Sequence, residues 1–324
     1  MSIELVHVIR GAKVESIHRG DIVAVDSKGE IVFSYGDPKK RTFWRSSAKP
    51  FQVLPLLRSN GFDHFNFNLK DLALMTASHG GEVEHVTAVK NILNKIGKSI
   101  DDLDCGISRP MHNESYVEML EKNLPFSAAN NPCSGKHSSM IAYGLMNNYD
   151  LKNYIREDHV IQKHMLKTVC EMTSLKEKVI DVAIDGCGVP VFGLPIYNMA
   201  LAYSRLINSK DEHMKKVVEA MTNFPFYVAG TDRLDTILME ETSGKILAKL
   251  GAESVYCMGI IDQGIGIALK IEDGNYRPLD AIIPKLLLKH KFINSKEYDK
   301  INSRLTLDIK NNRKEIVGRI KSII

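Results

Sequence analysis

Four short segments of the chain contain residue types that can perform nucleophilic catalysis or bind a metal ion. The first contains Ser46 and Lys49 in a Ser-x-x-Lys arrangement. Three residues apart on a helix, the two side chains share a face, so the amine can reach the hydroxyl. A serine is a weak nucleophile until a base takes its proton, and burial can lower the pKa of a lysine enough for that role. A helix cap beside a solvated lysine explains the same pattern.

The second segment covers residues 78–82, with the sequence SHGGE. Two glycines after a Ser-His pair allow backbone amides to approach a ligand closely, as an oxyanion hole or an anion-binding site requires. Glu82 and His85 could bind an ammonium group or transfer a proton. An ordinary loop with a capping serine is the alternative.

The third segment, CSGKH at residues 133–137, combines a thiol, a hydroxyl, an amine and an imidazole just before a predicted helix. Lys136 and the amides that follow it suit a carboxylate or a phosphate. Cys133 and His137 can be metal ligands, or a thiol nucleophile and its base. A purely structural loop is the alternative.

The fourth segment, DGCGVP at residues 185–190, follows a predicted buried strand. Strand ends in layered α/β folds commonly hold ligands. Asp185 can orient a substrate amine, and Cys187 can join Cys133 at one metal ion. The same residues are also ordinary turn chemistry. Lys249, much later in the chain, has no local pattern that distinguishes it from a surface lysine.

The elements that must position these segments are strand pairs near both ends of the chain, with helices between them. Alternating apolar residues predict one hairpin from residues 21–26 and 31–35 and a second from residues 255–260 and 266–271. Helices are expected over residues 45–57, 86–96, 137–146, 156–173, 196–207, 212–222 and 281–290, and a buried strand over residues 179–184. The pattern predicts an α/β fold of layered α+β type, with a central, mainly antiparallel sheet and flanking helices.

The composition is that of an average globular protein. The 324 residues include 43 Lys+Arg and 39 Asp+Glu, a net charge of +4, and 44% are hydrophobic. We expect one domain over residues 1–324, built as a single body or as two lobes around a cleft. Residues 281–324 contain eleven Lys/Arg and four Asp/Glu, so the positive charge belongs to a basic C-terminal tail, which we expect to be helical. No nucleic-acid partner is expected.

The chain has no apolar run of the roughly 18 residues that a membrane helix needs, and its first residues lack the pattern of a signal peptide. We therefore expect a cytoplasmic protein with no membrane partner. The cysteines are then expected to be reduced thiols, some of them available as metal ligands. They are Cys105, Cys133, Cys170, Cys187 and Cys257.

Seven segments, in this order between about residue 7 and residue 290, resemble the rhizobial-type (class 3) L-asparaginases, also known as the asparaginase II family. They are RSSAKPFQ at 45–52, ASHGGE at 77–82, CSGKH at 133–137, DGCGVP at 185–190, VAGTDR at 228–233, KLGAE at 249–253 and IALKIEDG at 267–274. Each is weak alone, and seven in register make the resemblance specific. The chain differs at Gly80, where the family often has serine, and at Pro132, where asparagine is expected.

The resemblance implies hydrolysis of L-asparagine to L-aspartate and ammonia, on a fold like that of serine β-lactamases and glutaminases. It also implies two Ser–Lys pairs, Ser46 with Lys49 and Ser78 with Lys249. We favour Ser46 as the nucleophile, because one helix turn fixes the position of its lysine, with Ser78 and Lys249 relaying protons.

The same resemblance implies a zinc site formed by Cys133, Lys136 and Cys187. Lysine must lose its proton to bind a metal, so zinc occupancy would depend strongly on pH. A homodimer is suggested as well. The candidates for substrate contact are Arg45, His79, His137, Asp185 and Gly188.

Two other hypotheses stay open at this point. A Ser–Lys hydrolase of the same fold can act on L-glutamine, a β-lactam or a peptide, and one methylene in a substrate is worth only about 1–3 kcal/mol in a pocket. The other hypothesis is a non-enzymatic zinc- or amino-acid-binding module. An assay of ammonia release from asparagine and glutamine, with and without a chelator, separates these hypotheses.

Overall fold

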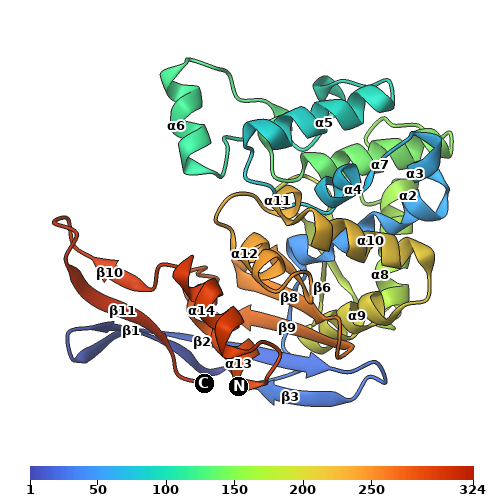
Figure 1. Ribbon diagram of the computed structural model, residues 1–324. Coiled ribbons are helices and arrows are strands. Elements are labelled where there is room, and N and C mark those ends of the chain that lie inside the picture. Colours follow the sequence, from blue (N-terminus) through green and yellow to red (C-terminus); the bar gives the residue numbers. More distant parts are fainter.

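The computed structural model describes residues 1–324 and contains one large antiparallel sheet that both ends of the chain form together (Figure 1). Its strands lie in the order β10-β11-β1-β2-β9-β8-β7, and β3 pairs with β2. Every residue of β8 and β9 is buried, so these two strands form the centre of the core. The strands are β1 (Ile3–Arg10), β2 (Lys13–Val25), β3 (Ile31–Tyr35), β7 (Ile246–Gly251), β8 (Val255–Ile260), β9 (Ile265–Ile271), β10 (Asp308–Lys310) and β11 (Ile316–Ser322).

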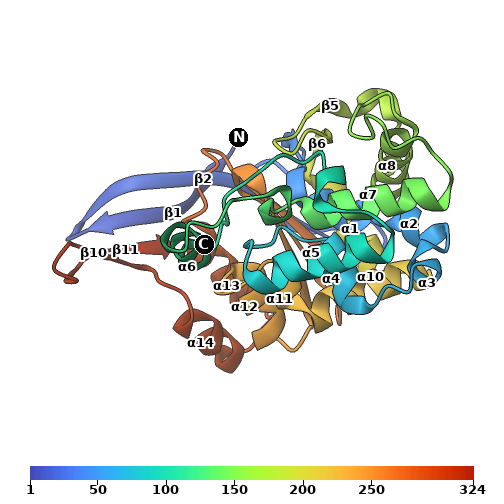
Figure 2. The same ribbon diagram turned by 90° about the horizontal axis from the view of Figure 1, so that it is seen from above.

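Helices cover this sheet and form a lobe beside it (Figures 1 and 2). α9 (Ile196–Asn208) packs against β2, β8 and β9. α6 (Asn113–Glu121) stands apart from the rest of the lobe and buries none of its residues. The lobe contains α1 (Lys49–Gln52), α2 (Leu54–Arg58), α3 (Gly61–His64), α4 (Leu69–Met75), α5 (Val83–Lys95), α7 (Ser134–Met146), α8 (Val160–Thr173), α10 (Glu212–Asn223) and α11 (Pro225–Val228).

A second, three-stranded sheet has the order β4-β6-β5. It consists of β4 (Arg41–Phe43), β5 (Asp181–Ile184) and β6 (Pro190–Pro195). α12 (Leu234–Glu241) packs against β7, and α13 (Leu279–Lys289) against β1 and β11. None of the helices combines the length and the low polarity that crossing a membrane requires.

The predicted fold class is confirmed, since a central antiparallel sheet is flanked by helices. Both predicted hairpins form, with Val23 opposite Ser34 in the first and Cys257 opposite Ala268 in the second. Strands β1 and β7 were not expected, and Lys249 lies on β7.

Two predicted elements differ from the structure. Residues 45–57 form a 3-10 helix (Arg45–Ala48) followed by α1 and α2, because Pro50 and Pro55 each start a new helical segment. The predicted buried strand over residues 179–184 is the shorter β5, and none of its four residues is buried. β5 is the edge strand of the small sheet and pairs only with β6, so its other edge is open to solvent.

The prediction of a helical tail over residues 281–324 is wrong for its second half. α13 and α14 (Ser295–Ser303) are followed by β10 and β11, and β11 pairs with β1, with Val8 opposite Ile320. The side chains of β11 alternate only partly between exposed and half-buried, and none is fully buried. The basic residues of the tail therefore lie partly on an outer strand of the main sheet.

Candidate active site

The hydroxyl of Ser78 lies between the amines of two buried lysines. Lys49 Nζ is 3.0 Å and Lys249 Nζ is 3.1 Å from Ser78 Oγ. Lys49 is 1% exposed and Lys249 is 0% exposed. Ser78 follows α4, and its N–H donates to the carbonyl oxygen of Val228 at 2.9 Å. Residues from three distant parts of the chain thus form one hydrogen-bonded cluster.

Lys49 is the first residue of α1, and its amine has three acceptors. It donates to Ser78 Oγ, to the carbonyl oxygen of Ala77 and, at 3.2 Å, to the carbonyl oxygen of Pro132. An ammonium group has three N–H donors and no acceptor, so these partners use its full hydrogen-bonding capacity. In this arrangement the Lys49 amine donates to Ser78.

Lys249 has a different environment. Its amine donates to the carbonyl oxygen of Leu250 at 2.8 Å and lies 3.8 Å from Asp235 Oδ2. Burial lowers the pKa of Lys249 to about 7, although the charge of Asp235 opposes this shift. A group with a pKa near 7 is present in both protonation states at neutral pH, so Lys249 can accept a proton as well as donate one.

Ser46 is not hydrogen-bonded to Lys49, in contrast to the arrangement expected from the Ser-x-x-Lys spacing. The segment Arg45–Ala48 is a 3-10 helix, and the carbonyl oxygens of Ala77 and Pro132 hold the Lys49 amine on the side of Ser78. Ser46 and Lys49 line one narrow cavity, which is too tight for a water molecule while Arg45 and Asp185 are paired, and the Ser46 hydroxyl makes no hydrogen bond within the protein. Lys49 therefore borders this cavity and also contacts Ser78.

Arg45 and Asp185 form an ion pair at the same cavity. The Arg45 guanidinium approaches Asp185 Oδ1 to 3.0 Å through Nε and to 2.8 Å through Nη2. Arg45 has a φ of +51°, which is unfavourable for a residue with a side chain and is often found at functional sites. Burial alone would raise the pKa of Asp185, but Lys136 and Arg45 outweigh it and hold this pKa below its usual value. The cavity is thus lined by three basic side chains, Arg45, Lys49 and Lys136, and by one carboxylate, that of Asp185.

His79 holds the Ser78 loop in place and does not line the cavity. Its Nδ1 accepts from the N–H of Gly81 at 3.1 Å, so its proton is on Nε2, which lies 2.8 Å from Ser134 Oγ. Burial lowers the pKa of His79 well below its usual value, which keeps the ring neutral. The Gly81 amide is used by this contact, and the Gly80 amide has no partner within the protein.

His137 and Gly188 also do not line the cavity, and each has a partner elsewhere in the protein. His137 Nδ1 lies 2.8 Å from the hydroxyl of Tyr154, and burial lowers the pKa of the ring to about 3. Its Nε2 is buried without a partner. Gly188 has a φ of +86° and closes the turn between β5 and β6, with its N–H donating to the carbonyl oxygen of Asp185. A positive φ here requires glycine or a strained residue.

The thiols of Cys133 and Cys187 and the amine of Lys136 form a buried cluster. Lys136 Nζ is 3.1 Å from Cys187 Sγ. A hydrogen bond from Cys133 and the charge of Lys136 lower the pKa of Cys187 to about 5, despite burial. The same hydrogen bond, with burial, raises the pKa of Cys133 to about 12. Cys187 is therefore the thiolate of the cluster, and it stabilises the charged form of Lys136.

This cluster fits a zinc ion in its donor types. Two sulfurs and one nitrogen are suitable ligands for tetrahedral zinc, and they would leave one coordination position open. No three side chains among His, Cys, Asp and Glu lie close enough together to hold a metal ion. Zinc at this place therefore requires Lys136 as a ligand, and binding must displace the proton that Cys187 stabilises on it.

Asp235 and Glu82 make contacts at the site that local sequence patterns do not reveal, although the SHGGE segment does mark Glu82 as a candidate for ammonium binding or proton transfer. Asp235 is 3% exposed, lies beside Lys249 and accepts from the N–H of Leu250 at 2.9 Å. Glu82 accepts from both the N–H and the hydroxyl of Thr231, which joins the Ser78 loop to the loop before α12. Both contacts link residues far apart in the chain, so no local pattern could reveal them.

Known proteins assign the chain to a family. The profile of a family described as L-asparaginase II matches residues 6–322. No curated protein matches the chain significantly. Among solved structures, the chain is similar to a β-lactamase (Mb2281c) from Mycobacterium bovis, with 7% sequence identity and a TM-score of 0.39, over 78% of this chain and 86% of that chain. Because the family profile covers essentially the whole sequence, the resemblance of the seven segments is confirmed, and the chain belongs to the L-asparaginase II family.

Proposed function

We propose that the protein hydrolyses the side-chain amide of L-asparagine to L-aspartate and ammonia through an acyl-enzyme on Ser46. The observation that carries this proposal is the hydrogen-bonded series Lys49–Ser78–Lys249 beside the cavity that Ser46 lines. Membership of the L-asparaginase II family supports asparagine as the substrate.

The proton of Ser46 moves along this series during attack on the amide carbon. Neutral Lys249 takes the proton of Ser78, and Ser78 takes a proton from the Lys49 ammonium. Lys49 is then neutral and removes the proton of Ser46 as the hydroxyl attacks. Lys49 passes that proton to the leaving nitrogen, so the C–N bond breaks and ammonia departs.

Hydrolysis of the acyl-enzyme uses the same groups in reverse. Lys49 takes a proton from water as the water attacks the ester carbonyl, and returns it to Ser46 as the C–O bond breaks. Protons then move from Lys249 through Ser78 to Lys49, which restores the starting state. The unpartnered N–H of Gly80 is available to stabilise the oxyanion in both steps.

Arg45 and Asp185 orient the substrate. An amino-acid substrate carries an α-carboxylate and an α-ammonium group, and the two can replace the partners that Arg45 and Asp185 provide to each other. Exchange of one ion pair for two keeps every charge compensated, which favours a zwitterionic substrate over a simple amide.

We also propose that Cys133, Lys136 and Cys187 bind zinc. A zinc ion would supply a fixed positive charge and a Lewis acid at the end of the cavity that Lys136 and Asp185 line. The donor set and the Lys136–Cys187 contact support the proposal. Metal content of the purified protein, measured before and after dialysis against a chelator, tests it.

Ammonia release from L-asparagine tests the proposed activity, with L-glutamine as a comparison substrate one methylene longer. Ser46→Ala and Ser78→Ala are each expected to reduce kcat by about 10³-fold or more. Ser59→Ala is a matched control, because its hydroxyl contacts only the carbonyl oxygen of Leu56. Turnover of neither amide at any zinc concentration would refute the proposal and favour a binding module.

The position of the acyl group can be determined directly, because trypsin places the two serines on different peptides, residues 46–58 and residues 71–90. After an acid quench during turnover, the mass of the aspartyl adduct is expected on the peptide that contains Ser46. An adduct on the other peptide would assign the nucleophile to Ser78.

The oligomeric state is a separate proposal. We propose a homodimer, which the family resemblance supports. Light scattering should then give twice the chain mass of 36.3 kDa, and a mass of one chain would contradict it.

A further inference from the structure

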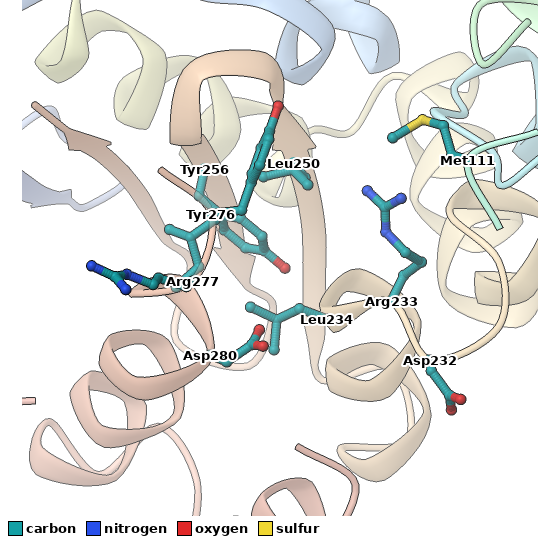
Figure 3. Close-up of a pocket in the computed structure, with 10 residues that line it drawn as sticks. Met111, Asp232, Arg233, Leu234, Leu250, Tyr256, Tyr276, Arg277 and Asp280 are labelled. Atoms are coloured by element: carbon teal, nitrogen blue, oxygen red, sulfur yellow. The ribbon is translucent and has the colours of Figure 1, made fainter. Parts of the chain in front are cut away.

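A cavity of about 330 Å³ lies beside the catalytic residues and contains none of them (Figure 3). One wall comes from the loop before α12 and the start of this helix, with Arg233 and Leu234. Another comes from the ends of β7 and β8, with Leu250 and Tyr256, and a third from the loop before α13 and its first turn, with Asp280. Most of the lining is apolar.

Three polar groups of this cavity have no hydrogen-bond or ion-pair partner in the protein. Figure 3 shows Arg233 and Asp280 reaching the cavity from opposite sides, and neither makes a hydrogen bond or a salt bridge. Tyr256 is 0% exposed, and its hydroxyl makes no hydrogen bond of normal geometry, although the Asp235 carboxylate lies near it. Buried polar groups are almost always paired, since an unpaired one costs about 1–3 kcal/mol, and Tyr256 is the buried group of the three. Arg233 and Asp280 are half-buried and border the same cavity, so a ligand there can supply partners to all three groups.

The chemistry of the unpaired groups restricts the ligand. A phosphate or another simple anion would pair with Arg233 but would also face the Asp280 carboxylate. A simple amine would pair with Asp280 and leave the guanidinium without a partner. Burial raises the pKa of Asp280 to about 6, and the charge of Arg233 limits this increase. At neutral pH the cavity therefore presents one cation and one anion around an apolar centre.

We propose that this cavity binds a free α-amino acid with an apolar side chain. Its carboxylate accepts hydrogen bonds from the guanidinium of Arg233, and its ammonium group donates to the carboxylate of Asp280 and to the hydroxyl of Tyr256. Its side chain packs against Leu234 and Leu250. The site differs from the catalytic cavity in lining residues, although both select a zwitterion.

Asp235 connects the two sites. It follows Leu234 of the cavity wall, its carboxylate accepts from the N–H of Leu250, and the same carboxylate lies 3.8 Å from Lys249 Nζ. Asp235 and Asp280 also contribute, after burial, to a raised pKa of Tyr256. An amino acid that binds between these groups changes the field at Lys249 and therefore the rate of turnover. This coupling rests on the proposed function, whereas the binding itself does not.

Calorimetric titration of the Ser46→Ala protein with L-leucine tests the binding without turnover. We expect saturable binding of L-leucine, and at least about tenfold weaker binding of 4-methylpentanoic acid and 3-methylbutan-1-amine, each of which lacks one charged group. Asp280→Asn and Tyr256→Phe should weaken L-leucine binding by about tenfold or more. Asp232→Asn is the matched control, because Asp232 lines the same cavity but is exposed, and it should change binding less than twofold.

Several results would overturn the proposal. One is the absence of heat with L-leucine in a protein whose circular dichroism shows that it is folded. Another is equal binding of the amine or the acid, and a third is competition between L-leucine and L-aspartate for one site. Unchanged steady-state kinetics of the wild type at saturating L-leucine would reject the coupling alone. A protein that binds L-leucine but hydrolyses neither amide would reject the proposed function and leave the second site in place.

Discussion

Replacement of Asp235 by asparagine tests whether Lys249 is the group that stores the proton. Asp235 is 3% and Lys249 is 0% exposed, so solvent screens their charges poorly. Their nearest nitrogen–oxygen distance is 3.8 Å. Asparagine keeps the shape of the side chain and an oxygen that can accept from the N–H of Leu250. The substitution therefore removes the charge and preserves the packing.

The size of the effect follows from the distance. With an effective dielectric constant of about 20, two unit charges this far apart interact by roughly 4 kcal/mol, or about three pKa units. Loss of the negative charge destabilises the ammonium form, so the pKa of Lys249 falls below its value of about 7. Only neutral Lys249 can accept the proton, so the fraction of competent enzyme at low pH increases. The weaker base also lowers the rate at the plateau.

The assay is kcat/KM for L-asparagine between roughly pH 3.5 and pH 9, a range that covers the wild-type inflection and one up to about three units lower. The wild-type rate should rise with pH through an inflection near the Lys249 pKa of about 7. For Asp235→Asn the inflection should move to lower pH by about one to three units. Asp232→Asn, an exposed carboxylate three residues earlier, should leave it in place. An inflection that does not move, or that moves to higher pH, would show that Lys249 is not the titrating base.

Three further substitutions have expected outcomes. Lys249→Met should abolish turnover and flatten the pH dependence of the free energy of unfolding, since a buried lysine with a pKa lowered to about 7 makes the wild type progressively more stable between about pH 7 and pH 10. Urea unfolding at pH 7 and pH 9.5 should show wild-type stability rising with pH and the stability of the variant changing less, and parallel pH dependences would contradict this. Cys187→Ser should reduce bound zinc per chain to a small fraction of wild type by elemental analysis, whereas Cys170→Ser, a cysteine outside the cluster, should not. Gly230→Ala should destabilise the protein by at least about 1–2 kcal/mol in urea unfolding, because Gly230 has a φ of +116° and an added Cβ would collide with the carboxylate of Glu82; unchanged stability would refute the role of this contact.

The layers of the fold could be predicted from local patterns, because hairpins and amphipathic helices depend on neighbouring residues. The pairing of β11 with β1 could not, since these strands are separated by about 300 residues and β11 follows two helices. The alternation of Ile316–Ser322 is weak, with no fully buried position. Such a strand can be identified from its pairing with β1 in the structure and not from its own sequence.

In the candidate site, too, local patterns predict some features, and contacts with distant residues decide the others. Spacing predicts that Lys49 can reach Ser46, and the structure instead holds its amine against Ser78 through the carbonyl oxygens of Ala77 and Pro132. Those acceptors come from two loops that the Ser-x-x-Lys pattern does not contain. The position of Lys249 was available only from the family resemblance, because 171 residues separate it from Ser78.

The different environments of the two lysines give the proton transfer its direction. Lys49 has three oxygen acceptors for three N–H groups, so its charged form is fully compensated by hydrogen bonds. Lys249 has two hydrogen-bond acceptors and a carboxylate at 3.8 Å, and burial brings its pKa to about 7. Pairs of titratable groups whose environments separate their proton affinities define the donor and the acceptor of a site. Lys49 can therefore become a base for Ser46 only after Lys249 has taken a proton through Ser78, which makes both serines necessary although only one forms the ester.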